Sequence, residues 1–347
     1  MINYEALYLL SSPALLSFMQ MLRESRHVVV CAHRSPDGDA MGSTLAWASY
    51  LHSLGKDVHI ILPNPAPDFL QWLPNARGII HFDRHESRAC SLLREADLVC
   101  CLDFNALSRL QNMEKPLADS KAKRILVDHH LNPAEDEFDF LVSHPEMSST
   151  CEIVFRLLLQ LGAYEGMTPE VATCIYCGMM TDTGNFAYSS SRPEIYEIVS
   201  LLLRCGIDKD RIYRNVFYTF SADRLRLQGF VLYEKLCWLA DGHAAFFTLS
   251  REEMKAAHFI RGDGEGLVNL PLQVKGTRLS ISLREDTERD VIRVSLRSVD
   301  DFPCNKMAEE FFNGGGHMNA SGGELPFPME DAVHTVERAV EAYRHLL

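Results

Sequence analysis

Four short and mostly apolar runs, the first two separated by a segment of helical periodicity, constrain the fold of this chain more than any other feature of its sequence. The runs have the length of buried strands and cover residues 28–32, 58–62, 96–102 and 124–127. A helical pattern from about Gly42 to Leu54 follows the first run, and Gly55 after it is typical of a helix end. This order of strands and helices predicts an α/β fold with a mainly parallel sheet and helices on both faces.

The length of the chain, 347 residues, suits two domains. Helical periodicity over residues 221–240 predicts a connecting helix. After it the sequence pattern changes from helical to strand-like. Strands rich in β-branched or aromatic residues are predicted at 243–249, 277–283 and 291–297. We therefore expect an N-terminal domain over 1–220, a helical linker over 221–240, and a smaller α/β domain over 241–347.

Charge and composition exclude several classes of protein. The formal net charge is −13, which argues against a protein that binds long duplexes. No stretch approaches about 18 uninterrupted apolar residues, so no membrane span is expected. The ten cysteines are scattered among apolar runs, which fits free thiols in a reducing, cytoplasmic setting.

The first apolar run ends in a cluster of polar side chains. His33 is followed by Asp37 and Asp39, while Pro36 and Gly38 favour a loop there. In an extended loop the two carboxylates would be about 6–7 Å apart, a span that suits two neighbouring metals better than one. An Asp-Gly turn that caps the following helix is the alternative, and it stays open at this point.

The third and fourth apolar runs also end in polar residues. Asp103 follows the third run, and Asp128, His129 and His130 follow the fourth. Open α/β sheets bind ligands at the carboxyl edge of their strands, where these residues are expected. Imidazoles suit transition metals, and a neighbouring carboxylate can orient them, so this cluster favours a metal site. A capping role in a turn is the alternative for Asp103.

Two helices are predicted between this cluster and a further acidic residue. The first, over 148–161, begins with a capping box in which Ser149 precedes Glu152 by three residues. The second, over 169–180, leads into Asp182 in a Thr-Asp-Thr-Gly segment that can bring a carboxylate close to an ion. A plain Asp-x-Gly turn is the alternative for Asp182.

A glycine-rich segment over residues 313–323 stands out in the C-terminal part. Gly314, Gly315 and Gly316 precede His317. Consecutive glycines let backbone N–H groups converge on an anion, so the segment predicts a phosphate-binding nest. A flexible loop without a ligand is the alternative.

Taken in order, these motifs resemble those of the DHH phosphoesterase family. The ordered set is H-x-x-x-D-x-D, a strand-end D, D-H-H, T-D-x-G and G-G-G-H-x-x-A-S-G, and it extends over nearly the whole chain. The C-terminal part resembles the DHH-associated domain. Within the family, the chain is most similar to the short bacterial members described as oligoribonuclease/3′-phosphoadenosine 5′-phosphate phosphatases.

The resemblance implies a dinuclear site for divalent metal ions, with Mn²⁺ as the metal. One metal would be held by His33 and Asp37, and Asp103 would bridge both metals. The ligands implied for the second metal are Asp39, His129 and Asp182.

The resemblance also implies catalytic and substrate-binding residues. His130 would lie near the scissile phosphate, with Asp128 orienting the two histidines. Arg297 and His317 match substrate-phosphate positions, next to Gly314, Gly315 and Gly316. Asn313 and Ser321 replace the Gly and Ala that are more usual in this loop, so substrate preference transfers less well.

The function implied is metal-assisted hydrolysis of a phosphoester in a cleft between the two domains. The expected substrates are short single-stranded RNA or DNA and small nucleotides. A cyclic or linear dinucleotide phosphodiesterase is an alternative, and a non-catalytic metal-bound nucleotide sensor is an alternative of another class. Metal-dependent release of mononucleotides would separate the enzymes from the sensor. The oligomeric state stays open, a homodimer included.

Overall fold

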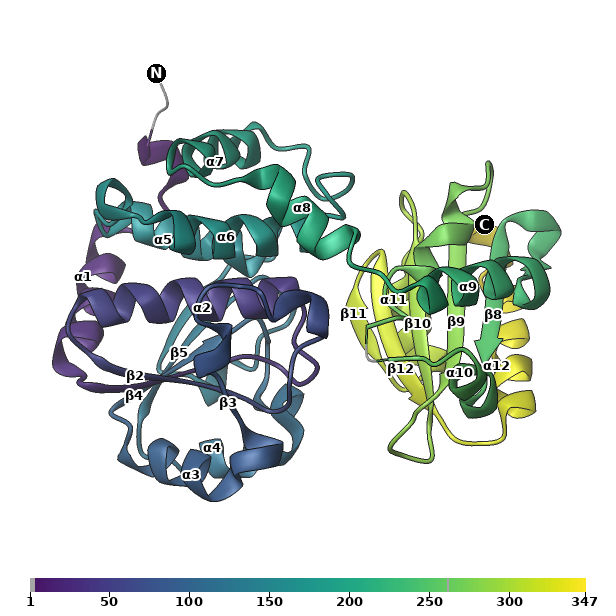
Figure 1. Ribbon diagram of the computed structural model, residues 1–347, viewed down its shortest axis with the longest axis horizontal. Helices are drawn as coiled ribbons and strands as arrows, with labels where there is room; N and C mark the ends of the chain where they lie inside the picture. The colour runs from purple at the N-terminus through teal and green to yellow at the C-terminus, as the bar shows by residue number, and fades with distance from the viewer. Residues whose placement is uncertain (1–3, 261) are drawn as a thin grey trace. The chain divides into compact units, whose positions relative to one another are not determined.

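In the computed structural model, which describes residues 4–260 and 262–347, the chain divides into two units. The first is Met1–Thr219 and the second is Phe220–Leu347. Each unit contains a six-stranded sheet covered by helices (Figure 1).

The sheet of the first unit is parallel throughout, as the sequence predicts. Its strand order is β3-β2-β1-β4-β5-β6. The strands are β1 His27–Cys31, β2 Asp57–Leu62, β3 Ile80–His81, β4 Leu98–Leu102, β5 Lys123–Asp128 and β6 Phe140–Ser143. Chain order reverses between β1 and β4, which makes the carboxyl ends of these two neighbouring strands the topological switch point of the sheet.

Helices cover both faces of this sheet, with α2, α5 and α6 over one face and α3 and α4 over the other (Figure 1). The helices of the unit are α1 Ser12–Glu24, α2 Gly38–Ser53, α3 Phe82–Glu95, α4 Glu114–Ala118, α5 Thr150–Gln160, α6 Pro169–Asp182, α7 Pro193–Arg204 and α8 Lys209–Phe217. In β1, Val28 and Val30 belong to the core on the α2 side, and Val29 and Cys31 to the core on the α3 side. A central strand buried on both faces needs a continuous apolar sequence, which explains why β1 and β4 were predictable.

The second unit has a mixed sheet in the order β11-β12-β10-β9-β8-β7. Its strands are β7 Cys237–Leu239, β8 Ala244–Leu249, β9 Leu279–Glu285, β10 Ile292–Ser298, β11 Gly315–His317 and β12 Ala320–Leu325. Only the β8–β9 pair is parallel among the pairs that the structure describes in this sheet. Its helices are α9 Ala222–Phe230, α10 Arg251–Ala256, α11 Cys304–Phe311 and α12 Met329–Ala342.

The prediction of a single connecting helix over 221–240 is wrong. Helix α9 ends at Phe230, a π-helical turn covers Val231–Lys235, and β7 then pairs with β8. Leu227 and Val231 pack with Phe247 in a core of the second unit. Because burial and strand pairing both tie this segment to the second unit, it cannot be a free linker.

No helix among the described residues combines the length and the apolar character that crossing a membrane requires.

Candidate metal centre

The strand ends predicted from sequence meet at the switch point of the first sheet. Strands β1 and β5 both pair with β4, one on each side. His33 follows β1 after one intervening residue, Asp103 follows β4 directly, and Asp128 is the last residue of β5. Asp103 has a positive φ of 65°, which turns the chain sharply at the sheet edge.

Asp37 and Asp39 lie at the start of α2 and not in an extended loop. The helix begins at Gly38, four residues earlier than the pattern from Gly42 predicts. Asp37 is its N-cap and accepts hydrogen bonds from the backbone N–H groups of Asp39 (3.0 Å) and Ala40 (3.1 Å). The capping role left open by the sequence is therefore real for Asp37, and it leaves the other carboxylate oxygen of Asp37 for a further partner.

Asp103 lies between two groups of potential ligands, with one carboxylate oxygen facing each. Its Oδ2 is 3.5 Å from His33 Nε2, which is itself 3.9 Å from Asp37 Oδ2. Its Oδ1 is 3.6 Å from His129 Nε2, which is 3.9 Å from Asp39 Oδ2. Each group therefore combines one imidazole, one carboxylate of its own and one oxygen of Asp103, within metal-ligating reach.

Asp182 joins the second of these groups. It is the last residue of α6, and its Oδ2 lies 3.4 Å from His129 Nε2. The side chain is 28% exposed, against 3% for Asp103, so it lies at the open side of the cluster. All six residues predicted as metal ligands are thus brought together.

The two imidazoles are oriented as metal ligands are. His33 Nδ1 lies 2.8 Å from the backbone carbonyl oxygen of Arg34, and His129 Nδ1 lies 3.3 Å from that of Met147. A carbonyl only accepts, so in each ring Nδ1 carries the proton. In a neutral ring Nε2 then presents a lone pair toward the carboxylates. Metal-ligating histidines are held in the same way.

Electrostatics in the cluster also favour a bound cation. Burial and the neighbouring carboxylates Asp39, Asp37 and Asp182 raise the pKa of Asp103 well above its ordinary value. Burial lowers the pKa of His33 and so favours its neutral, ligating form. Burial would lower the pKa of His129, but the neighbouring carboxylates Asp182 and Asp39 outweigh it and raise that pKa. Carboxylates buried so close together repel one another, and a divalent cation between them would offset that repulsion. The donor set of imidazole nitrogen and carboxylate oxygen therefore fits the divalent metal that the resemblance implies.

Asp128 and His130 form a hydrogen-bonded pair beside this cluster. Asp128 Oδ1 lies 2.7 Å from His130 Nδ1, and Asp128 is fully buried. Burial alone would raise the pKa of Asp128, but the hydrogen bond and charge of His130 outweigh it and lower that pKa. The hydrogen bond to Asp128 fixes the orientation of the His130 ring.

Thr150 is a site residue that sequence reasoning missed. Its backbone N–H donates to Asp39 Oδ2 (2.6 Å), and its hydroxyl donates to Asp103 Oδ1 (3.0 Å). The backbone N–H of Cys151 donates to Asp39 Oδ1 (2.8 Å). The first turn of α5 therefore holds two of the central carboxylates.

The signal for this contact was the predicted capping box, which the structure forms only in part. Ser149 Oγ accepts from the backbone N–H of Glu152 (3.0 Å), as predicted. The carboxylate of Glu152, however, accepts from Ser148 and pairs with Arg156 and Arg192. This ion-pair network around the buried Glu152 holds the segment that carries Thr150 in place.

The glycine segment of the second unit is a hairpin where the sequence predicts a loop. Strand β11 pairs antiparallel with β12, so the segment is extended where a nest would curl. A Cβ at Gly314 would overlap with the carbonyl oxygen of Gly322, and one at Gly323 with that of Phe312. The close approach of two backbones therefore explains Gly314 and Gly323, and the phosphate-binding role of Gly314, Gly315 and Gly316 stays a prediction.

Arg297 and His317 lie on one face of the second sheet. Both are directly opposite Ala320 on β12, Arg297 from β10 and His317 from β11. Directly opposed residues point to the same face, and two strand spacings separate these side chains by about 10 Å. The structure thus places both predicted substrate-binding side chains in one row.

Comparisons with known proteins agree with this architecture. The sequence profile described as "DHH family, N-terminal domain" matches residues 27–179. The bifunctional oligoribonuclease and PAP phosphatase NrnA of Thermus thermophilus is 29% identical over 322 residues, covering 92% of this chain and 90% of that protein.

Two solved structures extend the comparison. An exopolyphosphatase-related protein from Bacteroides fragilis is 48% identical, with a TM-score of 0.91, and the match covers 97% of this chain and 98% of that one. RecJ from Thermus thermophilus in complex with Mn²⁺ is 14% identical, with a TM-score of 0.54, and the match covers 98% of this chain and 56% of RecJ. At that identity the likeness to RecJ concerns the fold alone.

Proposed function

This chain belongs to the DHH family, and from that premise we propose that it is a phosphoesterase with two divalent metal ions that hydrolyses short oligonucleotides and the 3′-phosphate of adenosine 3′,5′-bisphosphate. Membership of the family supports a phosphoesterase acting on nucleotides. The choice of substrates rests on the Thermus thermophilus relative, whose name carries both activities and whose length this chain covers almost completely.

One observation carries the proposal: the two oxygens of Asp103 face two separate imidazole lone pairs. Oδ2 faces His33 and Oδ1 faces His129. A carboxylate shared in this way is the arrangement that a bridging ligand of a two-metal site requires. A single structural ion would not need the second imidazole group.

In this proposal the first ion is held by His33, Asp37 and Asp103, and the second by Asp103 with the ligands Asp39, His129 and Asp182. When bound, such ions supply an activated water and neutralise charge on the phosphoryl group. We propose Mn²⁺, in keeping with the mixed imidazole and carboxylate donors and with the Mn²⁺ complex of RecJ, which shares the fold.

His130 acts on the phosphate in this proposal. Asp128 holds the Nδ1 side of the ring, so Nε2 can donate a hydrogen bond or a proton to a phosphate oxygen. His130 is therefore a catalytic residue, and Asp128 acts through it.

The second unit supplies substrate recognition in this proposal. Arg297 and His317 present one guanidinium and one imidazole on a single sheet face, about two strand spacings apart. A guanidinium fork suits phosphate oxygens. In the hairpin of Gly314, Gly315 and Gly316, Gly315 contributes backbone at the edge of the sheet, without a Cβ to hinder a phosphate.

Polyphosphate is a second candidate substrate. The Bacteroides fragilis relative, at 48% identity, is described as exopolyphosphatase-related. Polyphosphate offers the same phosphoryl chemistry without a base, so the metal centre alone does not distinguish it from an oligonucleotide.

The test is a substrate panel run with Mn²⁺ and repeated with EDTA. It contains RNAs from dinucleotides upward, adenosine 3′,5′-bisphosphate, linear and cyclic dinucleotides, pyrophosphate and polyphosphate. We expect Mn²⁺-dependent release of mononucleotides from the shortest RNAs and of phosphate from the bisphosphate. Faster turnover of a cyclic dinucleotide or of polyphosphate would replace the proposed substrate, and tight binding without any turnover would indicate a sensor.

A further inference from the structure

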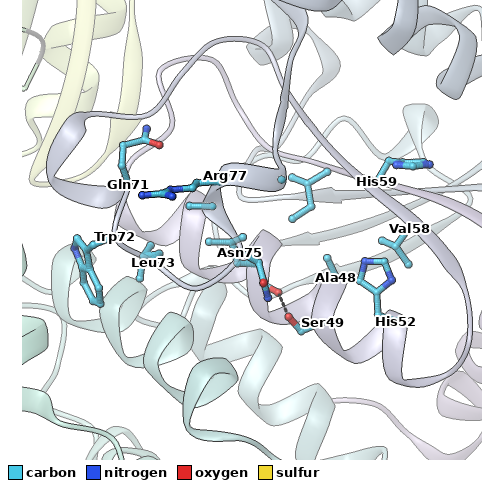
Figure 2. A pocket seen from close by; sticks show the side chains of 14 residues that line it. Ala48, Ser49, His52, Val58, His59, Gln71, Trp72, Leu73, Asn75 and Arg77 are labelled. Atoms are coloured by element: carbon cyan, nitrogen blue, oxygen red, sulfur yellow. Dashed lines mark hydrogen bonds between the residues drawn. The ribbon is translucent and has the colours of Figure 1, made fainter.

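A second pocket in the first unit lies away from the candidate metal centre. It has a volume of about 700 Å³ and is formed by α2, β2 and the segment that leads to β3 (Figure 2). Small-molecule sites fall in the range of about 300–1,000 Å³. From Asp39 to Ser49 in the pocket wall, α2 rises about 15 Å, so this cavity is separate from the acidic cluster.

The short strand β3 explains why the cavity exists. Only Ile61 and Leu62 of β2 pair with β3. Val58, His59 and Ile60, which precede them on β2, line the pocket instead. The sheet edge is thus left open there, and α2 covers it from one side.

The floor of the pocket is apolar and its rim is polar. Buried aliphatic side chains form the floor: Leu45, Ala48, Val58, Leu73 and Ala76. In Figure 2, Gln71 and Arg77 lie toward one end and His52 and His59 toward the other, with Ser49 and Asn75 between them. An apolar body with polar groups at both ends matches this distribution.

The charge of the pocket is opposite to that of the chain. The sequence has 47 acidic and 34 basic residues, yet none of the pocket-lining residues that the structure describes is acidic. Arg77 is exposed and forms no ion pair within the described part of the chain. His59 is the one basic group of the described lining with a nearby carboxylate, Asp57 at 3.5 Å. An unpaired guanidinium in an acidic protein is suited to an anion.

We propose that this pocket binds a small organic phosphate of nucleoside-monophosphate size. Arg77 and Gln71 would hold the phosphate, and the rest of the ligand would cover the apolar floor. The imidazoles of His52 and His59 would form hydrogen bonds with the polar edge of the ligand. The inference goes beyond the proposed function and does not depend on it.

The test is calorimetric titration with AMP of the full chain carrying Arg297→Ala and His317→Ala, in EDTA, so that neither a metal-bound site nor the proposed substrate-binding side chains of the second unit compete. Adenosine and orthophosphate are titrated separately, which measures how tightly the nucleoside part and the phosphate part of AMP bind on their own. We expect one AMP per pocket, with adenosine and orthophosphate each binding at least about tenfold more weakly, since each lacks one set of contacts.

Two pocket variants have matched controls. Arg77→Ala should weaken AMP at least about tenfold, the worth of one charged hydrogen bond, whereas Arg88→Ala, at an exposed arginine of α3, should not. Gly78→Phe should abolish binding by filling the cavity. A Cβ at Gly78 meets nothing within 4 Å, and the same is true of Gly166, so Gly166→Phe is the control.

Three results would overturn the proposal. The first is no AMP binding at about 1 mM, where even weak ligands bind. The second is AMP binding that Gly78→Phe leaves unchanged, which would place the ligand elsewhere. The third is a dimer that Gly78→Phe converts to a monomer in sedimentation, which would make the pocket an interface between copies of the chain.

Discussion

At the residue scale, the site depends on side chains that are held in place by other groups. Both candidate ligand imidazoles are held through Nδ1 by backbone carbonyls, and His130 is held by Asp128. Thr150 holds Asp103 from the first turn of α5. Such supporting contacts decide how well a metal or a phosphate is bound, because they fix tautomers and carboxylate orientation before either arrives.

Asp128→Asn should reduce kcat by about 10–100-fold and leave metal content unchanged, because it removes the charge that orients His130 without touching a proposed ligand. Asp128→Asn/His130→Ala should lose no more than His130→Ala alone, since the two residues act as a unit. Steady-state kinetics and metal analysis check this. Fully additive losses would show that Asp128 does not act through His130.

Thr150→Val should weaken metal binding and lower turnover by about tenfold or more, because Asp103 Oδ1 loses a donor while the backbone contact to Asp39 remains. Thr150→Ser should keep both properties. Thr44→Val is the control, since Thr44 is equally buried and its hydroxyl bonds only within α2. Metal affinity measured by calorimetry is the readout. Equal effects of the two valine variants would reduce the role of Thr150 to packing.

At the element scale, the sheet of the first unit positions the site. How well each of its strands could be predicted from the sequence depended on how deeply that strand is buried. Strands β1, β2, β4 and β5 were predictable because each carries at least three consecutive apolar residues. Strand β3 has two residues, too few for a pattern, and β6 is an edge strand in which only Val142 is fully buried. The hairpin of β11 and β12 was missed because its glycines carry no side chains, and only backbone pairing reveals it.

Helices α2 and α6 cross at a glycine, and this contact brings Asp39 and Asp182 to the same cluster. A Cβ at Gly42 would overlap with the carbonyl oxygen of Cys174 on α6. Gly42→Ala should therefore lower the free energy of unfolding by about 1–3 kcal/mol despite the higher helix propensity of alanine. Urea unfolding measures it. Gly166→Ala, which meets open space, should change little, and equal effects would argue against the tight crossing.

At the scale of the whole molecule, the family and the candidate ligands could be predicted because they form ordered motifs along the chain. The contacts of Thr150 could not, since they join residues 47 and 111 positions apart. The segment over 221–240 was misassigned for a related reason. The segment is helical as far as Phe230, where α9 ends. Its last residues form β7 because they pair with β8, a contact that the local pattern does not contain.

The net charge of −13 predicts weak salt dependence for substrate binding. With about one to three phosphate contacts, the slope of log affinity against log salt should be no steeper than about −2 for a single strand. Binding of dinucleotides and of long single-stranded RNA to metal-free protein, measured over a salt series, checks this. A steep slope with preference for the long RNA would contradict the short-substrate proposal.

The most direct test of the central claim is a Mn²⁺ titration of EDTA-treated protein, with turnover of a dinucleotide followed in the same samples. The native chain should bind two equivalents and become active as they bind. Asp103→Asn should bind less than two and lose at least about 100-fold in turnover, while Asp286→Asn, at a buried carboxylate of the second unit, should behave as the native chain. Two equivalents of Mn²⁺ and near-native turnover in Asp103→Asn would contradict the assignment of Asp103 as the shared ligand.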